Sequence, residues 1–246
     1  MERTSVSPRD NSRARGGASQ PAAPTTVRGA KTRTALVKAA RALFEKQGYL
    51  DTNVGDISRR ARVAHGTFYT YFTSKEEIFS EVADALETDF QRIADAEPHL
   101  PSGATLADRI ERTNRGYLRA YQESARMMAV LEQVATFNPR LAAIRRTSRR
   151  FFVQRSTDAI RRWQDQGLVD PALDAKYAAS ALGNMVGRSA YVWIVLGEPY
   201  EFDRAVEQLT RLYCNALQVP YDLTPPAVPA GASGAKAASR SAGRAR

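Results

Sequence analysis

The sequence predicts an all-α fold, with a small three-helix module near the N-terminus and a larger helical domain after it. Apolar residues recur at the three- and four-residue spacing of amphipathic helices through most of residues 31–218. Glycine and proline separate the periodic segments, as at Gly48, Pro98, Gly167 and Pro220. No segment combines alternating apolar and polar residues with hairpin turns, so no β-sheet is expected.

Length and composition exclude several classes of protein. The 246 residues can bury one substantial core and a small second module. The single cysteine, Cys214, excludes an internal disulfide and is expected to be a small buried apolar residue. His65 and His99 leave little for a metal site, and the sequence contains no phosphate-binding glycine loop, dinucleotide motif or nucleophile elbow. We therefore expect neither an enzyme nor a resident cofactor or metal.

Two further absences bear on location. The N-terminal arginines are not followed by the apolar run of a secretory signal. No stretch of about 18 apolar residues is available to cross a membrane. A cytoplasmic protein is expected.

The net charge of +10 is distributed unevenly along the chain. Residues 1–31, 32–79 and 220–246 each carry a net positive charge, whereas residues 80–219 are balanced. A neutral body with a basic module and basic ends indicates a localised contact with an anionic partner such as nucleic acid.

The composition also divides the chain into segments. Residues 1–30 and 221–246 are rich in Ser, Pro, Ala, Gly and Arg, so we expect disordered basic tails. The N-terminal tail is either a flexible arm that attracts an anionic partner or a solvated tail without consequence. Between the tails, residues 31–80 form the small module and residues 81–220 the larger domain.

The module is predicted to contain one long helix and two short ones. The long helix spans residues 31–47, and the first short helix follows Asn53, whose side chain can accept the backbone N–H of Asp56. The second short helix spans residues 65–72, and Ser74 can cap the helix after it.

Six longer helices are expected from Ser74 onward. The first belongs to both the module and the larger domain, so a change in its tilt can carry a signal between them. The expected ranges are 74–93, 106–122, 125–137, 138–166, 170–196 and 202–218.

Helix 65–72 has the properties of a helix that enters a DNA major groove. At about 1.5 Å per residue it is roughly 12 Å long, which matches the width of the groove. Phe68 and Phe72 fall on one side as anchors, while small and hydroxylated residues on the other side can approach base edges. Flanking tyrosines and nearby basic groups can reach phosphates. The expected DNA-contact residues are Arg33, Thr52, Asn53, Arg62, His65, Gly66, Thr67, Tyr69, Thr70, Tyr71 and Lys75.

Two segments of the module carry a resemblance to a known family. They are residues 48–57, Gly-Tyr-Leu-Asp-Thr-Asn-Val-Gly-Asp-Ile, and residues 61–77, Ala-Arg-Val-Ala-His-Gly-Thr-Phe-Tyr-Thr-Tyr-Phe-Thr-Ser-Lys-Glu-Glu. Together they resemble the TetR family of bacterial transcriptional regulators. The turn, the tyrosines and the Ser-Lys pair fall together at the family spacing. Two positions depart from it: Arg62 stands where the family usually has glycine, and Ala64 where it usually has Ser or Thr. The alternative is an ordinary helical hairpin in an all-α protein.

The resemblance implies a homodimer built from the last two helices, near residues 171–196 and 202–218. The first of these is apolar nearly all the way round and contains small residues that permit close helix contact. The alternative is a fully buried central helix of a monomer.

The resemblance also implies a pocket for a small-molecule effector in the larger domain. Aromatic, Met and Leu side chains on the central helices suggest a largely apolar ligand, although each could be plain core. The candidate lining residues are Phe90, Tyr117, Tyr121, Met127, Met128, Leu131, Phe137, Phe152, Trp163, Met185, Tyr191 and Trp193. The arginine cluster in residues 145–150 either captures an anionic ligand group or is a solvated face neutralised by acids on neighbouring helices.

The expected function is therefore that of a dimeric, ligand-responsive repressor that binds a palindromic DNA operator and leaves it when the effector binds. The rival hypotheses are a ligand-independent architectural DNA-binding protein and, more remotely, a helical carrier or enzyme.

Overall fold

Nine α-helices and one π-helical turn account for the regular structure of residues 26–95 and 103–221, the parts of the chain that the computed structural model describes. No strand is present within those residues, as the sequence predicts. The elements are α1 (Val27–Gln47), α2 (Val54–Arg60), α3 (His65–Tyr71), α4 (Lys75–Asp95), α5 (Leu106–Glu123), α6 (Ala125–Ala135), α7 (Pro139–Asp165), α8 (Ala175–Ala190), η1 (Tyr191–Val195) and α9 (Phe202–Leu217).

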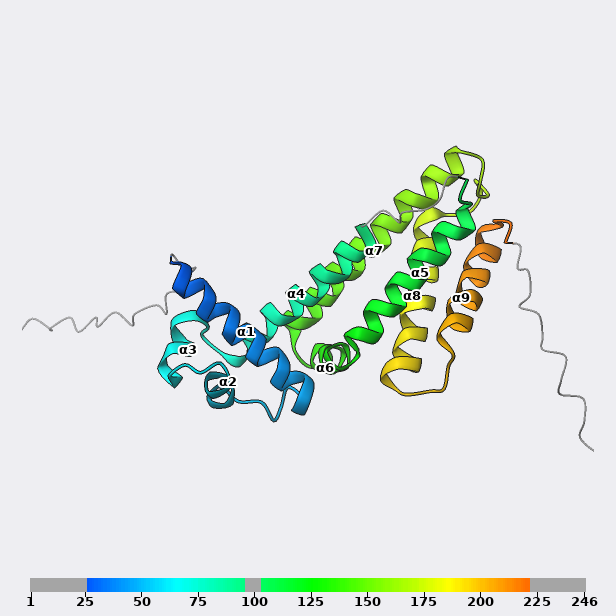
Figure 1. Ribbon diagram of the computed structural model, residues 1–246. Helices are drawn as coiled ribbons and strands as arrows, with labels where there is room; N and C mark the ends of the chain where they lie inside the picture. Colours follow the sequence, from blue (N-terminus) through cyan, green and yellow to red (C-terminus); the bar gives the residue numbers. More distant parts are fainter. Residues whose placement is uncertain (1–25, 96–102, 222–246) are drawn as a thin grey trace, which may run out of the picture.

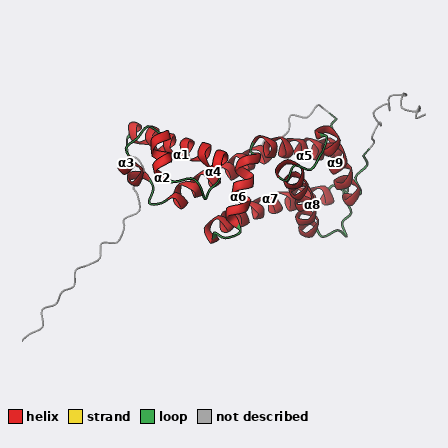
Figure 2. Ribbon diagram, turned by 90° about the horizontal axis from the view of Figure 1, so that it is seen from below, coloured by secondary structure: helices red, strands yellow, loops and turns green. Residues whose placement is uncertain are grey.

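The helices form an elongated molecule with the small module at one end (Figure 1). Helices α1, α2 and α3 make up this module, and α4 packs against both α1 and α7. At the other end α8 packs along α7, and α9 packs along α5. Figure 2 shows α6 between the two ends, where it contacts α1 and α7. Helix α4 is thus shared by the module and the body.

A continuous apolar core connects the two ends. It includes Phe44 and Phe68 in the module, Phe79 on α4 and Leu131 on α6, all of them fully buried. The ring centroids of Phe44 and Phe79 lie 4.8 Å apart in an edge-to-face arrangement, a favourable geometry for two aromatic rings. Because close-packed side chains transmit displacement, a change in the position of α4 must affect both ends.

A second, smaller core joins α5, α7, α8 and α9. It contains Ile160 and Cys214, both without exposed surface. Burial raises the pKa of the Cys214 thiol to about 11. The prediction that Cys214 is a buried apolar residue is confirmed.

Helix α1 begins four residues before the predicted start at Lys31. The Thr26 hydroxyl accepts the backbone N–H of Gly29 at 3.1 Å, so Thr26 is the N-cap and Val27 the first helical residue. Residues 27–30, predicted to belong to a disordered tail, are therefore helical. Residues 1–25 of that predicted tail lie outside the described residues, as do all residues but Tyr221 of the tail predicted for residues 221–246.

Helix α8 begins later than predicted. The Asp174 carboxylate caps it by accepting the backbone N–H groups of Lys176 at 2.9 Å and Tyr177 at 3.0 Å. Asp170, the first residue of the predicted helix, instead accepts the N–H of Ala172 at 2.8 Å within the preceding turn. A carboxylate before a helix is a cap signal, and the sequence offers two of them four residues apart.

The predicted helix to residue 196 ends in a wider helical form. The backbone N–H of Leu196 donates to the carbonyl of Tyr191 at 3.1 Å, a five-residue spacing that defines the π-helical turn η1.

None of the helices in the described residues has an apolar stretch that could span a lipid bilayer. The same residues contain no group of three His, Cys, Asp or Glu side chains placed to hold a metal ion.

Candidate DNA interface and central cavity

The turn between α2 and α3 is a Schellman motif built on a non-glycine residue. The N–H of Arg62 donates to the Arg59 carbonyl at 3.1 Å, and the N–H of Val63 donates to the Ser58 carbonyl at 3.0 Å. Arg62 adopts φ = +58°, in the left-handed region that favours glycine. The departure from the family pattern at this position therefore carries a backbone strain.

The start of α2 has the predicted cap. The side-chain oxygen of Asn53 accepts the N–H of Asp56 at 2.9 Å, and the Asn53 amide donates back to the Asp56 carboxylate at 2.8 Å. Helix α3 begins after Ala64, which makes no side-chain cap. The N-terminal N–H groups of α3 therefore lack the side-chain acceptor that stabilises most helix starts.

Helix α3 is anchored on one side and open on the other. Phe68 lies within it and Phe72 follows its last residue, and both are fully buried, as predicted. Tyr69 is 51% exposed, and its ring lies 5.5 Å from that of His65. A Cβ added to Gly66 would meet nothing within 4 Å. The surface made by these residues is low enough at Gly66 for another molecule to approach the backbone.

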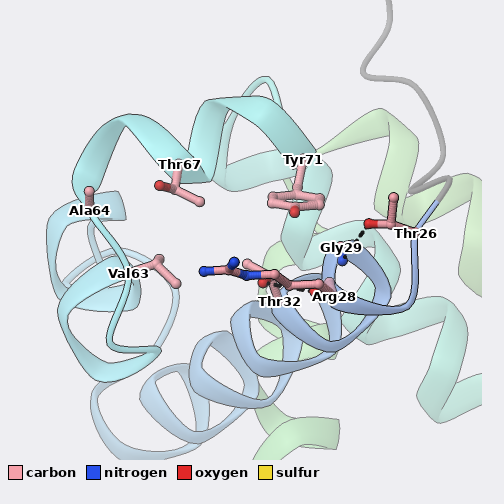
Figure 3. Close-up of a pocket in the computed structure, with 8 residues that line it drawn as sticks. All are labelled: Thr26, Arg28, Gly29, Thr32, Val63, Ala64, Thr67 and Tyr71. Atoms are coloured by element: carbon pink, nitrogen blue, oxygen red, sulfur yellow. Dashed lines mark hydrogen bonds between the residues drawn. The ribbon is translucent and has the colours of Figure 1, made fainter.

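A concavity of about 360 Å³ lies between α1 and α3. Thr67 and Tyr71 point into it from α3, and Arg28 reaches into it from the first turn of α1 (Figure 3). Thr32, one turn after Arg28, also lines it. Sequence reasoning missed Arg28 and Thr32. Thr26 could have revealed them, because threonine is a common N-cap residue and a cap at Thr26 places Arg28 in a helix rather than in a tail.

Two predicted contact residues are engaged inside the module. Thr52 is only 1% exposed, and its hydroxyl donates to the carbonyl of Gly48 at 2.7 Å, so the prediction of a DNA contact by this side chain is wrong. Arg33 pairs with Glu81 on α4 and lies 5.0 Å above the ring of Phe72. Its guanidinium ties α1 to α4.

Lys75 also has internal partners that the prediction did not include. Its ammonium donates to the carbonyls of Tyr49 at 2.7 Å and Leu50 at 3.3 Å, and lies 4.4 Å from the centre of the Tyr49 ring. Burial lowers the pKa of Lys75. The carbonyl oxygens satisfy a cation at the positive end of α4, which the prediction had assigned to a phosphate.

The body encloses a cavity of about 1180 Å³. It is larger than the usual 300–1,000 Å³ of small-molecule sites. Of the predicted effector residues, those that line it are Phe90, Tyr117, Tyr121, Met128, Phe152 and Tyr191.

The other six predicted effector residues do not line this cavity. Met127 and Leu131 are fully buried in the core of α6, Phe137 is 54% exposed, and Trp193 stacks on Tyr200 at 5.6 Å. The remaining two, Trp163 and Met185, pack against the apolar cores. Helical periodicity identifies an inward face, but only packing decides which inward residues meet empty space.

A partly buried ion cluster lies in the wall of the cavity. Arg145 on α7 donates to the Glu87 carboxylate on α4 at 2.5 Å and also pairs with Glu132 on α6. The Ser148 hydroxyl donates to the second oxygen of Glu87, which is only 5% exposed. Nearby, burial raises the pKa of Tyr117 to about 12, so its hydroxyl stays neutral. For Arg145, the expectation of neutralisation by acids on neighbouring helices is confirmed.

Other arginines of the 145–150 cluster differ from Arg145. Arg146 and Arg149 are exposed at the cavity and have no ion-pair partner in the part of the chain that the structure describes. Arg150 is exposed and does not line the cavity. The cluster thus divides into one half-buried, paired arginine, two exposed arginines at the cavity and one on the outer surface.

The last two helices present apolar groups to the outside. Tyr177 on α8 is 78% exposed and Leu212 on α9 is 52% exposed. The small residue Ala181 lies exposed one turn beyond Tyr177 on α8, whereas Gly183 lines the cavity. The inner face of α8, which includes Leu182, three alanines and one valine, is buried.

Comparisons with known proteins agree with this architecture. Residues 36–82 match the model of the bacterial regulatory proteins, tetR family. The uncharacterized HTH-type transcriptional regulator YhgD of Bacillus subtilis is 30% identical over 109 residues, which are 40% of this chain and 57% of YhgD. The chain thus spans little more than half the length of that relative.

The similarity to solved structures covers more of the chain. A proposed TetR-family transcriptional regulator of Mesorhizobium loti has a TM-score of 0.65 at 19% identity, covering 78% of this chain and 98% of the other. The regulator FadR of Bacillus subtilis, solved in complex with stearoyl-CoA, has a TM-score of 0.61 at 17% identity, covering 73% and 96%. At these identities the likeness shows a shared fold.

Proposed function

Because the chain belongs to the TetR family of bacterial regulatory proteins, we propose that it is a DNA-binding transcriptional repressor that responds to a small molecule. The observation that carries the proposal is the outer face of α3. This face is anchored from behind by two buried phenylalanines and exposes Gly66, Tyr69 and Thr70. Under this proposal the protein acts in the cytoplasm, where it can bind chromosomal DNA.

In this proposal α3 lies in a major groove. Its open side brings the backbone at Gly66 and the hydroxyls of Thr67 and Thr70 to base edges, while Tyr69 and Tyr71 reach phosphates at the flanks. The proposed contact set keeps eight of the eleven predicted residues and adds Arg28 and Thr32. It leaves out Thr52, Arg33 and Lys75, whose side chains have partners inside the protein. Its members are Arg28, Thr32, Asn53, Arg62, His65, Gly66, Thr67, Tyr69, Thr70 and Tyr71.

The second part of the proposal is a homodimer through α8 and α9. A seven-residue helix makes few base contacts, so a single copy would bind weakly. Two copies related by a twofold axis would read a palindrome whose half-site spacing equals the separation of the two α3 helices. The exposed Tyr177 and Leu212 supply apolar surface for that contact.

The third part of the proposal is that a ligand in the cavity controls the distance between the two α3 helices of the dimer. Helix α4 carries Glu87 in the cavity wall and Glu81 against Arg33 in the module. An effector that prefers one position of α4 would shift the dimer away from the DNA-binding spacing, and a shift from 99:1 to 1:99 requires about 5.5 kcal/mol of differential binding. The cavity volume and the complex of FadR with stearoyl-CoA support an effector with a substantial apolar part.

The proposal is tested with the full-length protein and genomic DNA. Bound fragments recovered from a genome-wide selection define the operator, and fluorescence anisotropy then measures its affinity. Tyr69→Ala and Thr70→Ala should each weaken operator binding by about tenfold, as expected for loss of one contact of about 1.4 kcal/mol. Thr88→Ala, an exposed threonine on α4, is the matched control and should have no effect. Unchanged operator affinity in both α3 variants would reject the docking face.

The alternative is a ligand-independent architectural DNA-binding protein. It predicts little preference for the recovered operator over random DNA and a steep dependence on salt, because phosphate contacts then supply nearly all the affinity. Competition with random-sequence DNA at two salt concentrations separates the two functions.

A further inference from the structure

The central cavity has an excess of positive charge. Its lining contains six arginines and two glutamates, with no lysine, aspartate or histidine, for a net charge of +4. Both glutamates pair with Arg145, and the lining contains five further arginines, of which Arg155 donates to the carbonyl of Ala94. Those five are Arg112, Arg146, Arg149, Arg155 and Arg188.

Two of these arginines lie close together on one helix face. Arg146 and Arg149 are three residues apart on α7, a spacing that places their side chains on the same side. Both are exposed, and neither forms an ion pair within the described residues. Adjacent like charges on a helix are unfavourable unless an anion lies between them. Arg188 joins the lining from α8, where its guanidinium lies 4.7 Å over the ring of Tyr191.

The deeper lining has a different character. Phe90, Tyr117 and Tyr121 form a cluster of rings, with centroids 5.7 to 6.2 Å apart. Met128 and Phe152 extend this apolar surface. The partly buried cluster of Arg145 with two glutamates carries a net negative charge, which would repel an acidic group placed beside it.

These observations indicate which part of the cavity favours an apolar group of a ligand and which part favours an acidic group. An apolar body fits the aromatic part of the cavity, whereas an acidic group is favoured beside Arg146 and Arg149 and disfavoured beside Glu87 and Glu132. Arginine pairs with carboxylate, sulfonate or phosphate through two parallel hydrogen bonds, so two arginines can orient such a group.

We propose that the cavity binds an amphipathic anion, with the acidic group held by Arg146 and Arg149 and the apolar body against Phe90, Tyr117 and Phe152. This inference rests on the proposed effector site and narrows it. A largely apolar ligand with few polar contacts, as predicted from the sequence, leaves the exposed arginines of the lining without a role. The acidic group is a required part of the ligand.

A pair of fluorescent probes tests the proposal. 8-Anilinonaphthalene-1-sulfonate and N-phenyl-1-naphthylamine share the same aromatic body, and only the first is an anion. The full-length protein should bind the anionic probe at least about tenfold more tightly, since charge-assisted hydrogen bonds contribute about this much. The double variant Arg146→Gln/Arg149→Gln should lose most of that preference and keep its affinity for the neutral probe. Arg150→Gln, which removes a neighbouring arginine outside the cavity, should behave like the original protein.

Competition then separates the possible acidic groups. Decanoate or decyl phosphate should displace the anionic probe, whereas decanol should compete poorly. The ratio of the concentrations at which decanoate and decyl phosphate displace half of the probe shows whether the site prefers a carboxylate or a phosphate. Equal binding of the two probes, an unchanged preference in the double variant, or displacement by decanol at the same concentration as the anions would overturn the proposal.

Failure of the two proposals can be told apart. Operator binding by the ligand-free double variant reports the DNA-binding function, because Arg146 and Arg149 lie in the body and outside the α1–α3 module. Retained operator binding with no probe preference rejects only the anion site. Unchanged operator affinity in the Tyr69→Ala and Thr70→Ala variants, with the probe preference intact, rejects only the proposed DNA interface.

Discussion

Replacing Arg62 by glycine should stabilise the protein while removing a positive charge from its DNA-binding end. Arg62 holds φ = +58° in the turn between α2 and α3. A non-glycine residue pays about 1–2 kcal/mol for a left-handed conformation. Glycine avoids this cost but loses about 0.5–1 kcal/mol through its greater freedom in the unfolded chain. The expected net gain is about 0.5–1 kcal/mol.

The molecule provides a matched control for this change at the far end. Gln218, after α9, has φ = +56° and the same hydrogen-bond pattern, in which Val219 donates to the Cys214 carbonyl at 2.9 Å. Gln218→Gly should therefore give a similar stabilisation. At the end of α7 the same motif already contains a glycine, Gly167, at φ = +69°.

Urea unfolding followed by circular dichroism measures the free energy of unfolding for both variants. Operator affinity measured over a range of salt concentrations then separates their functional effects. If Arg62 contacts a phosphate, Arg62→Gly should lower the slope of log affinity against log salt by about 0.9, whereas Gln218→Gly should leave it unchanged. A destabilised Arg62→Gly beside a stabilised Gln218→Gly would refute the strain assigned to the turn.

Three other predictions concern α3 and the cavity wall. Gly66→Ala should raise the free energy of unfolding by about 0.5–1 kcal/mol, because its Cβ meets no protein atom, yet weaken operator binding in an anisotropy titration; unchanged affinity would place the Gly66 face away from DNA. Ala64→Ser should stabilise the uncapped start of α3 by about 1 kcal/mol, as read from urea unfolding, and no gain would contradict the missing cap. Arg145→Met leaves the buried Glu87 without its cation and should cost about 3 kcal/mol, of which Glu87→Gln in the same background should recover part; additive losses in this double-mutant cycle would show that the pair is not coupled.

The arrangement of the DNA-binding end was largely readable from local sequence. The Asn53 cap, the start of α3 at His65 and the anchoring role of Phe68 each depend on residues within four positions of one another. Short-range hydrogen bonds and helical periodicity determine such features before any distant contact forms. The uncapped Ala64 was visible for the same reason.

The partners of long polar side chains were not readable. Lys75 contacts carbonyls 25 and 26 residues before it, and Arg33 pairs with a carboxylate 48 residues after it. A lysine or arginine side chain reaches several ångströms in many directions, so sequence position alone does not select its partner. Both had been predicted to contact DNA.

The sequence by itself determined the helical fold, the helix-turn-helix motif and the face of α3 that is left open, because these follow from spacing along a single chain segment. Tertiary structure alone decided which aromatic residues border the cavity, and which arginines are neutralised. Arg145 and Arg149 are one helical turn apart, yet the first is paired with acids from α4 and α6 and the second faces the cavity. Charge neutralisation and empty space depend on where neighbouring helices pack, and that information is distributed over the whole chain.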